Sequence, residues 1–185
     1  IIDVLEKEAK VNPGHRWRIE HAQVLDLLDI DRIKSSGAIP SVQPTHAVSD
    51  MRWAADRLGV ERMKGAYAYQ SLINQCGMIA IGTDFPIEHF NPFLTIHAAV
   101  QRKNSEDIPG GGFEVAERIS FVDCIKGMTS WASLASFEEE RLGTLEAGKD
   151  ATFAIFELPV RSTSNVVENF AKMTFIKGKK VYSAE

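Results

Sequence analysis

Residues 78–86 (MIAIGTDFP) form a short apolar run that ends abruptly in a carboxylate and a proline. A run of this length, introduced by Gly77, is typical of a strand buried on both faces of a parallel sheet. Asp84 lies where the strand ends, and Pro86 prevents it from continuing. Ligands and catalytic groups gather at the carboxyl ends of parallel strands, although an Asp there can also simply cap a loop or a helix. The run therefore favours an α/β fold with Asp84 as a candidate functional residue.

Two earlier segments are also predicted to be strands, and polar side chains follow each of them. Residues 16–21 alternate in polarity and end at His21. Residues 38–43 form the second strand, which Pro44 stops. Helices are expected before, between and after the strands, at residues 1–10, 29–34, 50–58, 71–75, 92–103, 120–128 and 131–137. Strands and helices therefore alternate as they do in an α/β protein.

The pattern changes near residue 140. Residues 143–150 have the composition of a turn, residues 151–156 are predicted to be a strand, and residues 173–183 have the pattern of a β-hairpin. Helices followed by strands alone indicate a separate structural unit. We therefore expect an α/β body over residues 1–140 and a small β tail over residues 141–185.

The predicted strands are too few for a closed barrel. An open parallel sheet of three strands is thin, because both of its faces must be covered. A complete (β/α)8 barrel usually takes about 250 residues, whereas this chain has 185. The chain could supply the last three strands of such a barrel. Because it begins with Ile1 inside a helical pattern rather than with Met, we expect it to be a segment of a longer protein.

Composition excludes several classes of function. The chain is 44% hydrophobic and 25% charged, with a formal net charge of -4, and no cluster of Lys and Arg is dense enough to predict nucleic-acid binding. No apolar stretch is long enough to cross a membrane. Cys76 and Cys124 lack the spacing of a metal site, so we interpret them as reduced cysteines of a cytoplasmic protein.

Polar residues that can bind a metal lie at or just beyond the three predicted strand ends. They are His21, the pair Gln43 and His46, and Asp84. His and Asp are metal ligands, and an Asp beside a metal can also accept a proton from water. A catalytic zinc ion takes about three protein ligands, so His21 and Asp84 would need at least one more. The alternative is that these histidines are hydrogen-bonded structural residues, and the pattern alone favours that interpretation for His46.

Four motifs resemble those of the amidohydrolase superfamily. Residues 18–23 (RIEHAQ) are similar to the motif of its sixth barrel strand, and residues 41–46 (SVQPTH) to the segment after the seventh. Residues 81–86 (IGTDFP) resemble its eighth-strand motif, and residues 142–151 (LGTLEAGKDA) its tail signature. The motifs occur in the order and spacing of the superfamily. The branch of closest resemblance is the metal-dependent hydrolases similar to N-acyl-amino-acid deacylases and exo-acting amidases.

The resemblance implies the C-terminal part of a (β/α)8 barrel, strands six to eight, with a β-sandwich tail. It implies that His21 and Asp84 bind a divalent metal, most simply zinc, and that Asp84 is the catalytic base for a metal-activated water that hydrolyses a C–N bond. His46 and Gln43 would line the pocket for a small-molecule substrate. The remaining ligands would come from the N-terminal remainder of the same chain, so the segment by itself is expected to be inactive.

One departure from the family pattern bears on the substrate. Relatives usually have Arg where this chain has Gln70, and a neutral amide cannot hold a substrate carboxylate as a charge. The alternative to an enzyme is a non-catalytic half-barrel that pairs with another chain, because a partial sheet has exposed edges. A homo-oligomer is one form that such pairing could take.

Overall fold

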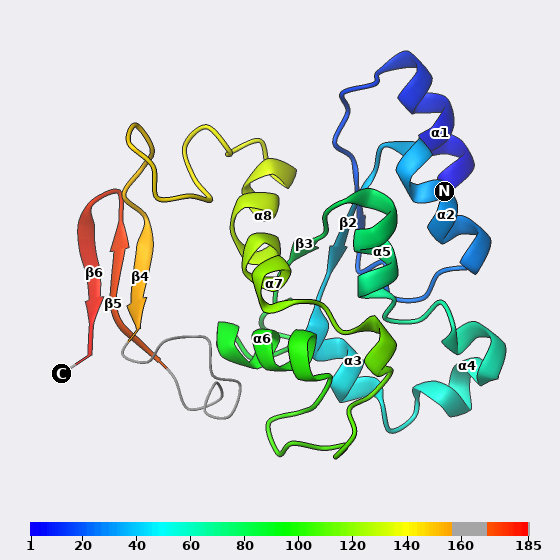
Figure 1. The fold of residues 1–185 in the computed structure, drawn as a ribbon. Helices are drawn as coiled ribbons and strands as arrows, with labels where there is room; N and C mark the ends of the chain where they lie inside the picture. Colours follow the sequence, from blue (N-terminus) through cyan, green and yellow to red (C-terminus); the bar gives the residue numbers. More distant parts are fainter. Residues whose placement is uncertain (157–169, 185) are drawn as a thin grey trace.

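A computed structural model describes residues 1–156 and 170–184 of the chain (Figure 1). Its first sheet contains β1 (Arg18–Glu20), β2 (Ile39–Val42) and β3 (Ala80–Ile81), all parallel and in the order β1-β2-β3. The register aligns Glu20 with Ser41, and Ser41 with Ala80. The prediction of an α/β body with three parallel strands is therefore confirmed.

Helices precede, connect and follow these strands. They are α1 (Ile2–Val11), α2 (Leu27–Ser36), α3 (Pro44–Asp50), α4 (Ala54–Met63), α5 (Tyr69–Cys76), α6 (Pro92–Gln101), the 3-10 turn η1 (Val115–Glu117), α7 (Phe121–Met128) and α8 (Ser130–Ala135). The side chains of Asn91 and Ser120 accept hydrogen bonds from the backbone N–H groups of Phe93 and Asp123. These two caps fix the predicted starts of α6 and α7.

The segment after β2 differs from the prediction. The sequence predicts that Ser49 or Asp50 caps a helix that ends before Gly59, but both residues lie at the end of an additional helix, α3. Pro44 begins that helix, because its fixed φ suits the first helical position and its missing N–H is not needed there. Gly59, with φ 73°, produces a kink inside α4 instead of ending it. The correction matters because α3 carries His46.

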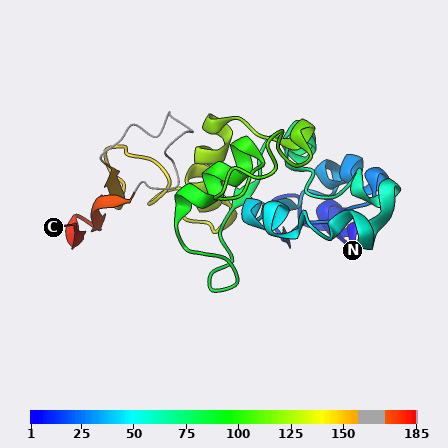
Figure 2. The ribbon, with the colours of Figure 1, turned by 90° about the horizontal axis from the view of Figure 1, so that it is seen from below.

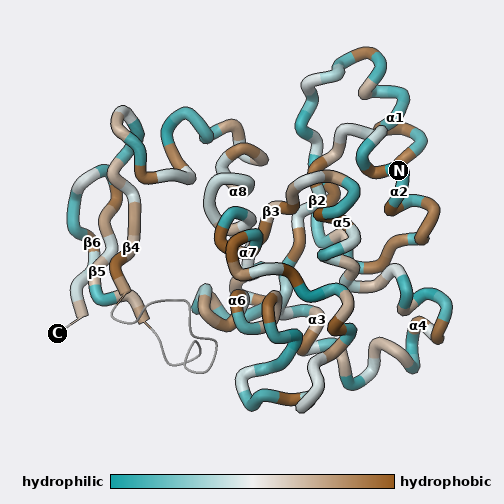
Figure 3. Tube along the Cα trace, viewed as in Figure 1, coloured by the Kyte–Doolittle hydropathy of each residue, from teal (hydrophilic) through white to brown (hydrophobic). Residues whose placement is uncertain are grey.

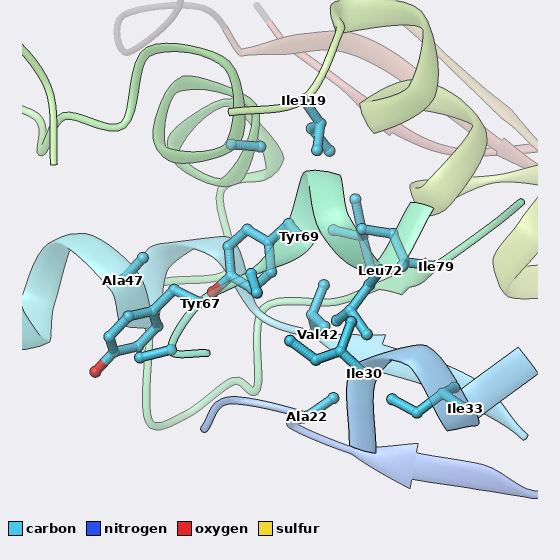
Figure 4. Packing of buried hydrophobic residues seen from close by; sticks show 14 of the residues in the cluster. Ala22, Ile30, Ile33, Val42, Ala47, Tyr67, Tyr69, Leu72, Ile79 and Ile119 are labelled. Carbon is cyan, nitrogen blue, oxygen red and sulfur yellow. The ribbon is translucent and has the colours of Figure 1, made fainter. Parts of the chain in front are cut away.

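The main core lies between the parallel sheet and the helices that cover it. Figure 4 shows Val42 of β2 and Ile79, which directly precedes β3, beside Leu72 and Tyr69 of α5, and all four are almost completely buried. The helix α7 comes so close to β3 that a Cβ atom at Gly127 would lie 3.1 Å from the Ile79 carbonyl oxygen. Figure 3 shows hydrophobic residues along parts of β2, β3 and α7, and hydrophilic residues at many loop tips.

A second sheet is antiparallel and contains β4 (Phe153–Phe156), β5 (Ala171–Ile176) and β6 (Lys179–Ser183), in that order. Figures 1 and 2 show it to one side of the parallel sheet. Phe156 packs edge-on against Phe93 of α6 and joins the core there. The predicted strand and hairpin of the tail are confirmed. Within the described ranges, no helix is both long enough and apolar enough to cross a membrane.

Candidate metal centre

Three candidate ligands follow three neighbouring parallel strands. His21 comes directly after β1, His46 lies in the first turn of α3 after β2, and Asp84 follows β3 across Gly82 and Thr83. Because the strands are parallel and adjacent, their carboxyl ends meet at one edge of the sheet. The helices α3 and α6 pack together beside that edge, below the sheet in Figure 1.

The three side chains converge at this edge. One ligand atom from each of His21, His46 and Asp84 lies within 4.8 Å of the other two. The Nε2 atom of His46 is 3.3 Å from Oδ2 of Asp84, and the imidazole rings of His21 and His46 have centroids 5.7 Å apart. No other group of three or more such residues with this spacing exists in residues 1–156 and 170–184.

His46 lies between two carboxylates. Its Nδ1 is 3.3 Å from Oε1 of Glu88 and its Nε2 faces Asp84 at the same distance. Glu88 also accepts a hydrogen bond of 2.7 Å from the Ser49 hydroxyl. The contact between Nε2 and Asp84 has the geometry of a hydrogen bond, whereas Nδ1 and Glu88 are at ion-pair distance only. A cation bound at Nε2 would take the lone pair of that nitrogen and leave the proton on Nδ1, which faces Glu88. The arrangement therefore suits a positive charge at the position the three residues share.

The backbone at two of these residues has an uncommon conformation. His21 has φ 67° and Asp84 has φ 60°, in the left-handed region that residues other than Gly rarely adopt. Such conformations cost of order 1–3 kcal/mol each and cluster at functional sites. Here they occur after β1 and after β3, at the two residues that the sequence singles out as ligands.

A partly buried hydrogen-bond network connects the segments that carry the two histidines. The Oδ2 atom of Asp50 accepts 2.7 Å and 2.9 Å hydrogen bonds from Gln23 Nε2 and the Tyr67 hydroxyl. Asp50 lies one helical turn after His46, and Gln23 lies just after His21. Burial is the main reason that the pKa of Tyr67 is raised to about 12, so its hydroxyl remains a donor. The network holds α3 against the loop that follows β1.

The other residues that the sequence singles out lie outside the cluster. Gln43 is buried, and its Oε1 atom has no hydrogen-bond partner among the described residues. The side chain of Gln70 donates a hydrogen bond to Asn74 within α5. Neither Glu88 nor Asp50 was predicted from the sequence to be part of a functional site. The available signal for Asp50 was its i, i+4 spacing from His46, but that signal requires knowing that α3 is a helix.

The donor set fits a divalent transition metal such as zinc. Two imidazole nitrogens and a carboxylate oxygen are ligands that zinc uses in catalytic sites. Ligands of one tetrahedral zinc ion, each about 2.0–2.2 Å from the metal, lie roughly 3.4 Å from one another. The 3.3 Å between His46 Nε2 and Asp84 Oδ2 matches that separation. Glu88 occupies the place of a carboxylate that orients a ligating histidine through its other nitrogen.

Comparisons with known proteins identify the family that the chain resembles. A family model described as "Amidohydrolase family" matches residues 1–182. The chain is 35% identical over 195 residues to Protein LONG AFTER FAR-RED 3 of Arabidopsis thaliana, covering 98% of this chain and 32% of that protein.

Two solved structures are also similar, both described as uncharacterized metal-dependent hydrolases. The one from Pyrococcus horikoshii has a TM-score of 0.67 at 29% identity, and the one from Pyrococcus furiosus has 0.64 at 32%. Each match covers 81% of this chain and 30% of the solved chain. The chain thus spans about a third of the length of these relatives.

Proposed function

This chain belongs to the amidohydrolase family, and from that premise we propose that it is a segment of a metal-dependent hydrolase that cleaves C–N bonds other than peptide bonds. The proposed segment supplies strands six to eight of a (β/α)8 barrel, and the small antiparallel sheet is its part of a β-sandwich tail. The parallel order of β1, β2 and β3 and the similarity to two metal-dependent hydrolases support this assignment.

His21, His46 and Asp84 are the proposed residues that hold the metal. The sequence motifs suggest His21 and Asp84, and the observation that supports all three is their convergence within 4.8 Å. A divalent ion in this position would lower the pKa of a bound water to near neutrality and polarise the substrate carbonyl. Zinc is the proposed ion because the donors are two nitrogens and one oxygen.

Asp84 is the proposed catalytic base. A carboxylate has two oxygens, so Asp84 can hold the ion with one and accept a proton from the attacking water with the other. Returning that proton to the leaving nitrogen completes the hydrolysis of an amide. Glu88, 3.3 Å from Nδ1 of His46, is the proposed residue that orients its imidazole, and the buried, unpaired Oε1 of Gln43 is the proposed acceptor for a substrate N–H group.

Metal binding by the purified chain tests the proposed site. We expect the chain to bind one Zn²⁺ ion, and we expect His21→Ala and Asp84→Asn each to weaken binding by at least about tenfold. The matched control is His89→Ala, since His89 is an exposed histidine that lies in the same loop as Asp84 but outside the cluster. Titration with a competing chelator measures the affinity. Equal affinity in all variants would contradict the proposal.

The chain alone is expected to bind metal without hydrolysing a panel of amides and esters. About three protein ligands suffice for zinc, but a catalytic site must also position the substrate. We propose that the missing contacts come from the rest of the barrel. Metal-dependent turnover by the 185 residues alone would contradict this expectation.

A non-catalytic module is the second candidate function. In the described residues, β1 and β3 each pair with β2 only, so that each has one edge without a strand partner. Open edges of a parallel sheet favour pairing with another chain. Zn²⁺ binding would favour the hydrolase over the non-catalytic module, because a purely structural half-barrel does not require converging ligands.

A further inference from the structure

A cavity of about 300 Å³ lies between α3 and the segment that follows α6. Ser49 of α3 and Arg52 beyond it line one side, and Lys103, Asn104 and Ser105 line another. Sites for small molecules typically occupy about 300–1,000 Å³, so this volume accommodates one end of a small substrate rather than a whole one.

The cavity carries two cations with little compensation. Arg52 is exposed and forms no hydrogen bond or ion pair with any residue that the structure describes. Lys103 is 23% exposed, and its Nζ atom is 4.0 Å from the nearest carboxylate oxygen, that of Asp107. A guanidinium and an ammonium that line one cavity both attract an anion bound there. The hydroxyl and amide groups of the lining add neutral hydrogen-bond donors.

The one acidic residue of the lining is already engaged. Glu88 accepts the hydrogen bond from Ser49 and faces Nδ1 of His46. Its charge is therefore directed toward the candidate metal centre. Because Glu88 belongs both to the cavity wall and to the surroundings of His46, the cavity adjoins the metal centre.

We propose that this cavity binds an anionic group of the substrate, a carboxylate or a phosphate, through Arg52 and Lys103. This proposal rests on the proposed function, since it requires a scissile bond at the His21, His46 and Asp84 cluster. A substrate whose anionic group occupies the cavity has its opposite end held beside that cluster. Arg52 supplies a planar fork for a carboxylate or phosphate, and Lys103 supplies a point charge.

The experiment titrates the ¹⁵N-labelled 185-residue protein with acetate, inorganic phosphate or acetamide, in the presence of a chelator. Acetamide has the shape of acetate without its charge. We expect acetate and phosphate to shift the amide resonances of Ser49, Asn104 and Ser105, and acetamide to leave them unchanged. The ratio of the acetate and phosphate affinities then separates a carboxylate site from a phosphate site. Absence of saturable shifts at these amides with either anion would overturn the proposal.

Variants distinguish anion binding in the cavity from attraction to general surface charge. We expect Arg52→Gln and Lys103→Gln each to weaken anion binding roughly tenfold, as is usual for loss of a charged hydrogen bond. Arg57→Gln removes the same charge from an exposed position on α4 outside the cavity and is expected to have no effect. Equal weakening by all three variants would overturn the proposal. Loss of Zn²⁺ binding with intact anion binding would overturn the proposed hydrolase but leave the anion site standing.

Discussion

At the scale of single residues, Asp50 connects the segments around the candidate metal centre, a role that its position in the sequence does not predict. Its carboxylate accepts hydrogen bonds from both Gln23 and Tyr67, whose own segments pair with each other through the bridge between Val24 and Ala66. Removing the carboxylate would leave two donors unpaired in a partly buried setting. A group left unpaired in this way costs about 1–3 kcal/mol. The network also determines how the segments bearing His21 and His46 face each other.

The variant Asp50→Ala is expected to lower the free energy of unfolding by about 1–3 kcal/mol and to weaken Zn²⁺ binding about 10–100-fold. Urea unfolding measures the first effect and a chelator competition measures the second. The control Asp56→Ala removes an exposed carboxylate of α4 and is expected to change neither. If Asp50→Ala lowers stability while the folded variant binds Zn²⁺ with unchanged affinity, Asp50 is structural and does not position the ligands.

Two buried thiols make stability depend on pH. Burial raises the pKa of Cys76 to about 11 and that of Cys124 to about 12, from an ordinary value of 9.0. The folded protein therefore keeps thiol protons that the unfolded chain releases, so stability is fully present below about pH 9 and falls as the pH rises toward 12. Burial raises the pKa of Tyr67 as well, which acts in the same direction.

The expected outcome is a lower urea midpoint at about pH 10 than at about pH 8. In Cys124→Ala the loss between the two pH values should be smaller, because one of the two thiols no longer titrates. Ellipticity at 222 nm follows unfolding in both proteins. An identical pH dependence with and without Cys124 would show that its thiol does not contribute.

At the scale of elements, the contact between α7 and β3 depends on a glycine. A Cβ atom at Gly127 would lie 2.6 Å from Cδ1 of Ile81 and 3.1 Å from the Ile79 carbonyl oxygen. The Ile81 side chain can move, but the backbone oxygen cannot move without displacing β3. Because Asp84 follows β3 closely, a shift of that strand also moves a candidate ligand.

We expect Gly127→Val to destabilise the protein by about 1–3 kcal/mol, the usual cost of overpacking a core. Gly110→Val, at a position with no heavy atom within 4 Å of the added Cβ, is expected to change stability by less than about 0.5 kcal/mol. Thermal or urea unfolding compares the two variants. Equal stability of both would mean that α7 can withdraw from the sheet at no cost.

At the scale of the whole molecule, the parallel sheet has two edges without a strand partner in the described residues, one on β1 and one on β3. Phe85, Ile87 and Phe90 are also 64–71% exposed in the loop beside the metal centre. Unpaired edges and exposed apolar side chains both favour association. Within a complete barrel, we propose that other strands and loops would cover these surfaces.

Sedimentation velocity tests whether the open strand edges and exposed apolar side chains cause association. The 185-residue protein is expected to associate as its concentration rises, because pairing at the strand edges and burial of apolar side chains both stabilise a complex. The same measurement with Phe85→Ser should show weaker association if the apolar loop contributes. A protein that remains monomeric at all concentrations would indicate that the open edges are protected, and would weigh against a module that acts by pairing.

Much of the secondary structure follows from short-range signals in the sequence. Asn91 and Ser120 mark the starts of α6 and α7, because a capping side chain acts on N–H groups only two or three residues away. The apolar run before Asp84 identifies a buried strand for a similar reason. The segment after Pro44 was predicted wrongly, since a proline that stops a strand can equally begin a helix.

The sequence by itself determined the order of strands and helices and the polar residue types at the strand ends. Only the tertiary structure decided that His21, His46 and Asp84 meet within 4.8 Å, that Glu88 faces Nδ1 of His46, and that Asp50 links their segments. The physical reason is distance along the chain: caps and periodicity act within a turn or two. Contacts between positions 21, 46 and 84 depend on strand register and on helix packing, which no local pattern encodes.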